Sequence, residues 1–204
     1  MQERILETAD RLFYRRGIRA VGVDTVAAEV GISKRTLYNH FPSKDALIVA
    51  YLSRRFRPTG SSDLPPAEQV LGDFDRLERA FAANGFRGCP FVNAVAELAE
   101  PAHAANKLAV AYKEQRRAWF RERLTWLDVA DADGLATQLM LLVDGAISAA
   151  LVRGEPKMAR AAKEAARVLL ATAGVHVSAA VATTGTSRSK RRTGRRARGL
   201  PPPQ

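Results

Sequence analysis

Residues 22–47 constrain the fold of this chain most, because they read as two short helices joined through a glycine. Four apolar residues recur there at the spacing of one helix face: Val23, Val26, Ala27 and Val30. Gly31 follows at once, where a residue that tolerates positive φ can end a helix and turn the chain. Ser33 is a good N-cap, so the pattern predicts a second helix over about residues 34–40.

The two faces of this second helix differ in chemistry. Leu37 and Phe41 fall together on one side, which we expect to pack inward. The other side carries two cations, a phenol and an amide: Lys34, Arg35, Tyr38 and Asn39. Cations neutralise phosphates, and amide and guanidinium groups bond base edges, so a helix-turn-helix that reads a DNA major groove is one interpretation. A solvated amphipathic helix in an ordinary all-α core is the alternative, and spacing alone does not separate the two.

The identity of the residues favours DNA binding. The segment ISKRTLYNHFPSKDAL resembles the recognition helix and following helix start of TetR-type transcriptional repressors, over roughly residues 1–57 and more weakly beyond. The matched positions are Gly31, Ile32, Ser33, Thr36, Leu37, Tyr38, His40, Phe41 and Lys44. The resemblance implies an all-α protein of about nine helices. A three-helix DNA-binding head would precede a helical body that binds a ligand and dimerises.

Two sets of candidate DNA contacts follow. We expect Lys34, Arg35 and Asn39 to read base edges, since Arg and Lys favour guanine and Asn favours adenine, with each pair giving about 1–3 kcal/mol of discrimination. Phosphate contacts are expected from the remaining candidates: Thr36, Tyr38, His40 and Lys44. For His40 a packing or capping role is the alternative.

Charge is distributed unevenly along the chain, whose formal net charge is +11. Residues 1–57 carry +5, residues 58–175 carry −1 and residues 176–204 carry +7. These segments are the expected head, body and disordered basic tail, and a polyanionic partner is expected at the two ends. The single Cys89 excludes an internal disulfide framework, and the first residues lack a signal-peptide pattern, so a cytoplasmic location is expected.

In the body, Pro66 and Pro90 fit helix starts, and a long helix is expected over 102–127. Tyr112, Trp119 and Trp126 recur at intervals of seven and should share one face. The wetter side of that helix is expected to carry Arg116, Arg117, Arg121, Glu122 and Arg123.

Residues 134–153 are the most apolar stretch, and a transmembrane helix is an alternative there. Asp144 at its middle would be costly in lipid, so we expect a helix buried on nearly all sides and no membrane. The resemblance implies that 134–153 and 157–173 pair with their copies across a two-fold axis in a homodimer. A purely intramolecular core is the alternative.

A ligand cavity is implied by the resemblance, because bundle proteins bind small molecules between helices. Its candidate lining residues, each of which could instead be simple core, are Phe74, Leu77, Phe81, Tyr112, Trp119, Met140 and Asp144. Asp144 would need a partner if buried: a cationic ligand, an arginine, or its counterpart in a dimer.

Signals for catalysis are thin. The chain has three histidines, and no HExxH, GxSxG, Walker or dinucleotide glycine pattern, so no enzyme, metal site or cofactor is expected. The resemblance implies a ligand-responsive transcriptional regulator, most simply a repressor that binds a quasi-palindromic DNA operator as a dimer and is released by a small-molecule effector. A non-specific DNA binder driven by the basic tail and a helical small-molecule-binding protein are the alternatives.

Overall fold

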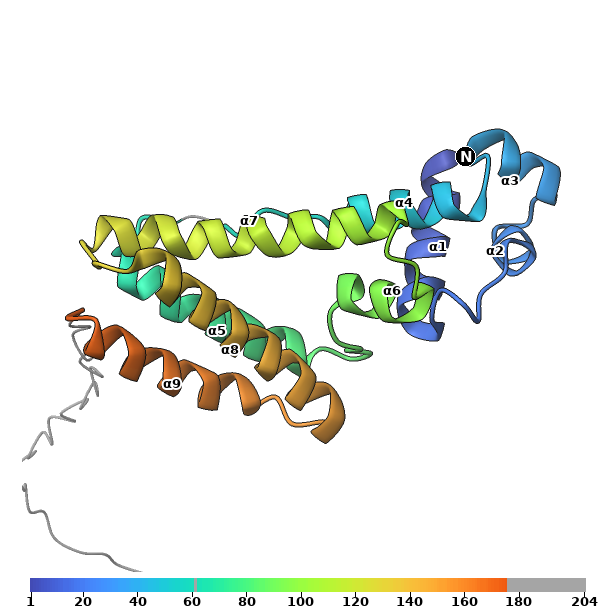
Figure 1. Ribbon diagram of the computed structural model, residues 1–204. Helices are drawn as coiled ribbons and strands as arrows, with labels where there is room; N and C mark the ends of the chain where they lie inside the picture. The colour runs from blue at the N-terminus through green and yellow to red at the C-terminus, as the bar shows by residue number, and fades with distance from the viewer. Residues whose placement is uncertain (61, 176–204) are drawn as a thin grey trace, which may run out of the picture.

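The computed structural model describes residues 1–60 and 62–175, and these residues form nine α-helices and no strand (Figure 1). The helices are α1 (Gln2–Arg16), α2 (Val23–Val30), α3 (Lys34–His40), α4 (Lys44–Arg55), α5 (Pro66–Ala82), α6 (Pro90–Leu98), α7 (Ala104–Trp126), α8 (Ala132–Arg153) and α9 (Met158–Thr172). The predicted all-α fold is confirmed. The predicted basic tail, residues 176–204, lies outside the described residues.

The helix starts and stops of the first four helices follow from local chemistry. Gly31 ends α2 with φ 76°, a left-handed conformation that favours glycine. The hydroxyl of Ser33 accepts a hydrogen bond from the backbone N–H of Thr36 at 3.0 Å and so caps α3. Ser43 caps α4 in the same way through the N–H of Ala46, also at 3.0 Å. These caps hold α3 at a defined angle between its neighbours.

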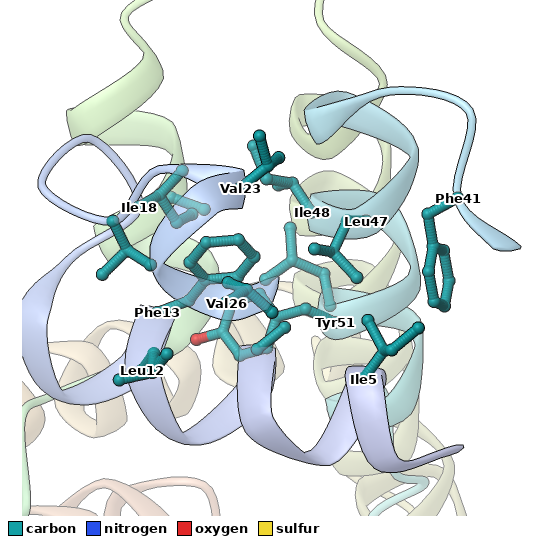
Figure 2. Packing of buried hydrophobic residues seen from close by; sticks show 14 of the residues in the cluster. Ile5, Leu12, Phe13, Ile18, Val23, Val26, Phe41, Leu47, Ile48 and Tyr51 are labelled. Carbon is teal, nitrogen blue, oxygen red and sulfur yellow. The ribbon is translucent and has the colours of Figure 1, made fainter. Parts of the chain in front are cut away.

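A hydrophobic core joins α1, α2, α3 and α4 (Figure 2). Phe13 of α1 and Tyr51 of α4 meet edge to face, with ring centroids 5.6 Å apart. Ile5, Leu37 and Leu47 are completely buried around them, and each such burial contributes about 1.5–3 kcal/mol. The same core continues into α6 and α7 through Phe91 and Ala105. The first helices are therefore packed directly on the body.

A second core belongs to α5, α7, α8 and α9. Helix α8 lies between α7 and α9, and α5 packs against α9 and α7 (Figure 1). By length and hydropathy α8 resembles a membrane span, as its sequence suggested. Its packing against α5, α7 and α9 is that of a bundle helix, and Asp144 at its middle forms an ion pair with Lys113 of α7.

The aromatic face of α7 is buried only in part, and the expectation about Arg123 is wrong. Trp126 is 55% exposed although Trp119 is buried, and Arg123, expected on the wetter side, is only 1% exposed. Trp126 is the last residue of α7 and lies outside the second core, whereas Trp119 lies one repeat earlier, within that core. Arg123 can enter the core because its guanidinium lies over the rings of Trp119 at 4.3 Å and Trp126 at 5.1 Å and pairs with Glu122. Arg116 is also largely enclosed, beside Asp73.

The composition of α8 predicted a helix buried on nearly all sides, and this prediction is wrong. Leu141 is 66% exposed and Val152 is 82% exposed. Val168 on the neighbouring α9 is 65% exposed as well. One apolar face of the α8–α9 pair is therefore uncovered in a single chain.

Candidate nucleic-acid interface and ligand cavity

Helix α3 lies at the end of the molecule opposite to α5 and α9 (Figure 1). Leu37 is completely buried and anchors the helix, while Arg35, Tyr38 and Asn39 are exposed. A helix held by one apolar side chain with a guanidinium, a phenol and an amide facing out can enter a groove and bond base edges and phosphates.

Lys34 is exposed but already has a partner. Its Nζ lies 3.0 Å from a carboxylate oxygen of Asp24 in the first turn of α2. This hydrogen bond and the charge of Asp24 raise the pKa of Lys34. A phosphate or a guanine that contacts Lys34 would have to compete with that carboxylate.

The other predicted contacts lie around the two ends of α3. The Thr36 hydroxyl is 2.9 Å from the Ser33 hydroxyl and thus takes part in the cap. His40 is half-buried in the last turn, and Lys44 is half-buried at the start of α4. All seven predicted residues lie on α3 or at the start of α4.

Ion pairs fasten α4 to α1 beneath this surface. Arg55 donates to both carboxylate oxygens of Asp10, at 2.6 and 2.9 Å, and its guanidinium lies 4.2 Å from the ring centroid of Tyr14. Arg54 pairs with Glu3 in the first turn of α1. Burial raises the pKa of the Tyr51 hydroxyl between these helices. Helices α1 and α4 therefore form one base, to which α3 is attached chiefly through α2.

A cavity of about 400 Å³ lies behind this base. It is lined by the end of α5, the following loop to Pro90, α7 and α8. Five of the predicted lining residues belong to it: Leu77, Phe81, Tyr112, Met140 and Asp144. Phe74 and Trp119 do not. Phe74 is 1% exposed within the second core, and Trp119 packs against Phe120 and Arg123.

The charged groups of the cavity wall are arranged in ion pairs. Lys113 is the partner of Asp144, in place of the cationic ligand, arginine or second copy considered from the sequence. Arg116 pairs with the buried Asp73, which also bonds Arg76 at 2.6 Å. Burial acts to lower the pKa of Arg116, but Asp73 and Tyr112 outweigh it and raise that pKa, so the guanidinium stays charged.

Tyr14 belongs to both regions, which the sequence did not indicate. It lies on α1 and also lines the cavity. Its hydroxyl donates to the carbonyl of Gly88 at 3.0 Å and accepts from the backbone N–H of Arg87 at 2.9 Å. The guanidinium of Arg87 donates to the Tyr14 carbonyl at 3.2 Å. The loop that forms one wall of the cavity is thus bonded to α1.

Glu97 of α6 makes a second connection to the end of α1. Its carboxylate accepts from the backbone N–H of Arg19 at 3.0 Å and lies 3.9 Å from the Arg87 guanidinium. Gly17 has φ 94°, and a Cβ there would lie 2.9 Å from Oε2 of Glu97. Only glycine therefore fits this junction without a shift of the carboxylate.

Comparison with known proteins agrees with this architecture. The family described as "Bacterial regulatory proteins, tetR family" matches residues 5–51, which span α1 to the middle of α4. An uncharacterised HTH-type transcriptional regulator of Mycobacterium tuberculosis is 36% identical over 75 residues, 37% of each chain. The chain thus matches little more than a third of the length of this relative.

Two solved structures match nearly throughout. A TetR-type transcriptional regulator of Streptomyces avermitilis is 33% identical with a TM-score of 0.77, over 86% of this chain and 98% of that one. A TetR-family transcriptional regulator of Streptomyces coelicolor, SCO4454, is 32% identical with a TM-score of 0.78, over 84% of this chain and 94% of that one. The likeness covers the helix-turn-helix and the body together. The chain belongs to the TetR family of bacterial regulatory proteins.

Proposed function

We propose that this protein is a dimeric, cytoplasmic repressor that binds a quasi-palindromic DNA operator and releases it when a small-molecule effector enters the cavity. The observation that carries the proposal is α3, which buries Leu37 and exposes Arg35, Tyr38 and Asn39 within a helix-turn-helix. Family membership supports regulation of transcription as the outcome of that binding. No catalytic step, metal or cofactor is part of the proposal.

The uncovered face of α8 and α9 supports the dimer. Leu141 and Val152 of α8 and Val168 of α9 are exposed apolar side chains on adjacent helices. Gly145 and Ser148, which lie between Leu141 and Val152 on α8, are small and exposed, so a second helix can approach closely. Two copies related by a two-fold axis would bury this face and present two α3 helices to successive major grooves.

We assign base reading to Arg35 and Asn39, with Lys34 joining after it leaves Asp24. Phosphate contacts are assigned to Thr36, Tyr38, His40 and Lys44. Lys34 must leave Asp24 before it contacts DNA, and breaking this ion pair subtracts from the binding energy. Operator affinity should fall with rising salt, because cation–phosphate contacts release counterions from the DNA.

Release of DNA follows from the bonds between the cavity and α1. An effector that displaces the loop of Arg87 and Gly88 would pull on Tyr14, and α1 is fastened to α4 through Asp10 and Arg55. A difference of about 1–3 kcal/mol in effector affinity between the two forms is typical of such coupling.

The test is selection of bound sequences from a random duplex pool by the full chain at near-physiological salt, followed by titration of the enriched duplex. We expect a quasi-palindrome. The double variant Arg35→Ala and Asn39→Ala should lose at least tenfold in affinity for it, because each base pair contact gives about 1–3 kcal/mol of discrimination.

Arg79→Ala is the matched control, since it removes an exposed guanidinium from α5 in the body. It should leave affinity unchanged, and circular dichroism should show the same helix content in all three proteins. Unchanged operator affinity of the double variant would refute the assignment of its two residues. Enrichment of no sequence, with binding that depends only on salt, would favour a non-specific binder.

A further inference from the structure

We propose that the cavity takes a small apolar carboxylate whose anionic group binds at Arg116. The inference rests on the proposed function only in placing the effector in this cavity. It names the chemical class of ligand, which neither the family nor its relatives specify.

The ion pairs around the cavity leave one positive charge in excess. Lys113 and Asp144 neutralise each other. Asp73, however, is shared between Arg76 and Arg116, so two guanidinium groups face a single carboxylate. Arg76 is 41% exposed and is hydrated, whereas the Arg116 side chain is only 11% exposed. The cluster of Asp73, Arg76 and Arg116 therefore carries a net positive charge, and Arg116 is the member that lines the cavity and that water screens least.

Arg116 also has an unused hydrogen-bond donor. Its Nε is buried and has no hydrogen-bond partner. Arg116 lines the cavity. A guanidinium binds carboxylates through parallel N–H donors, so an anion in the cavity would satisfy both the excess charge and the vacant donor.

The remaining lining residues determine the chemistry of the part of the ligand that lies away from Arg116. Leu77, Phe81, Phe86, Met140, Val143 and Ile147 are apolar and line the space on several sides. A volume of about 400 Å³ lies within the range of small-molecule sites. The ligand is therefore expected to be apolar apart from its anionic end.

A cationic ligand fits this wall poorly. Among the lining residues that the structure describes, Asp144 is the sole carboxylate, and Lys113 already pairs with it. A cation would have to displace that lysine and remain close to Arg116. The lining residues thus carry two cations against one anion before any ligand enters.

The test compares ligands of equal shape and different charge. The panel consists of phenylalkanoates and alkanoates of graded length, each with its amide and its amine, for example 4-phenylbutyrate, 4-phenylbutanamide and 4-phenylbutylamine. Binding to the full chain without DNA is measured by calorimetry and by the shift in melting temperature. We expect the best acid to bind at least tenfold tighter than its amide, and its amine to bind weakest. Amides or amines that bind as tightly as acids, or an absence of binding by every acid, would overturn the proposal.

Two variants locate the anionic group. Arg116→Gln should remove the preference for the acid over the amide. Because Arg116 holds the buried Asp73, loss of folding is a possible cost of this change, and Asp144→Asn provides an independent test. Asp144 is 38% exposed, and its removal leaves the Asp73 pairs intact, so acids should bind several-fold tighter and amines weaker.

Glu114→Gln is the control for Asp144→Asn. It changes the net charge of the chain by the same amount, but Glu114 lies on α7 outside the cavity wall. It should leave the acid-to-amide ratio unchanged. An acid preference that Asp144→Asn fails to increase, or that Glu114→Gln increases equally, would contradict a local charge effect in the cavity.

Titration of the selected operator duplex with each ligand separates this inference from the proposed function. Acids that bind the cavity without changing operator affinity would support the ligand class and refute its role as effector. Operator release by amides or amines, with acids inactive, would support the effector role and refute the ligand class.

Discussion

Arg55, Arg116 and Arg123 occupy sites that water reaches poorly, and each is accommodated by the flat shape of its guanidinium. Arg55 lies over Tyr14 and bonds Asp10, and Arg123 lies between two indole rings. Arg116 faces Asp73. A lysine would keep the charge at these sites but lose the stacking and the paired hydrogen bonds. At the scale of single residues, the packing of the core therefore includes arginine side chains whose charge is stabilised by aromatic rings and carboxylates.

Ser33→Ala tests whether one capping hydroxyl sets the pose of the recognition helix. The hydroxyl bonds the Thr36 N–H and hydroxyl, and its loss should lower the free energy of unfolding by about 1 kcal/mol. Operator affinity should also fall, because α3 frays at its start. Urea unfolding and duplex titration measure the two effects. Ser53→Ala, which changes an exposed serine in the last turn of α4, should change neither. Equal stabilities of the Ser33 variant and the unmodified chain would contradict the role of the cap.

Tyr51→Phe tests the effect of burial on a phenol. Because burial raises the pKa of Tyr51 above its ordinary value of about 10, the neutral hydroxyl is favoured in the folded state. Its contribution is fully present below pH 10 and is lost as pH rises through the higher folded pKa. The unmodified chain should therefore lose more stability than Tyr51→Phe above about pH 10. Denaturant titrations at a series of pH values give the difference. Parallel curves over the whole range would show that Tyr51 is not responsible.

At the scale of helices, the sequence predicted the features that residues close along the chain determine, such as helix ends and caps. The residue types at helix ends predicted where helices begin and end. The structure has N-caps at Ser33 and Ser43 and a left-handed C-cap at Gly31. The partners of Arg116 and Asp144 come from helices distant in sequence, so no local pattern specified them. For the same reason the sequence missed the cavity role of Tyr14.

Tyr14→Phe tests the connection between the cavity loop and α1. The variant keeps the ring but loses the bonds to Gly88 and Arg87. Ligand affinity without DNA and operator affinity without ligand should change little. The factor by which ligand weakens operator binding should fall towards one. Duplex titrations with and without ligand measure this factor. Tyr51→Phe is the control, because it removes a hydroxyl from the same helical core away from the loop. Full release of operator by ligand in the Tyr14 variant would exclude this route.

At the scale of the whole molecule, the uncovered face of α8 and α9 marks the expected dimer contact. Leu141→Asp and Val168→Asp each place a charge on that face, and burying a charge without a partner is costly. Light scattering should detect monomers at concentrations where the unmodified chain is dimeric, and operator affinity should fall with dimerisation. Val110→Asp changes a similarly exposed valine on α7 and should leave the dimer intact. Dissociation by Val110→Asp alone would move the interface to α7.

Tyr14 has a consequence for how such a protein can acquire new responses. Because one wall of the proposed effector cavity is built from a helix of the DNA-binding head, substitutions that remove the Tyr14 ring or reshape the loop bonded to it should alter effector binding and DNA binding together. Met140, Val143 and Ile147 line the same space from α8, outside the DNA-binding head. Substitutions at these α8 positions can therefore change which compound the protein binds without changing which operators it binds. The cavity thus has one wall, on α8, where substitutions can change ligand preference alone, and another wall, at Tyr14 and its loop, where they cannot.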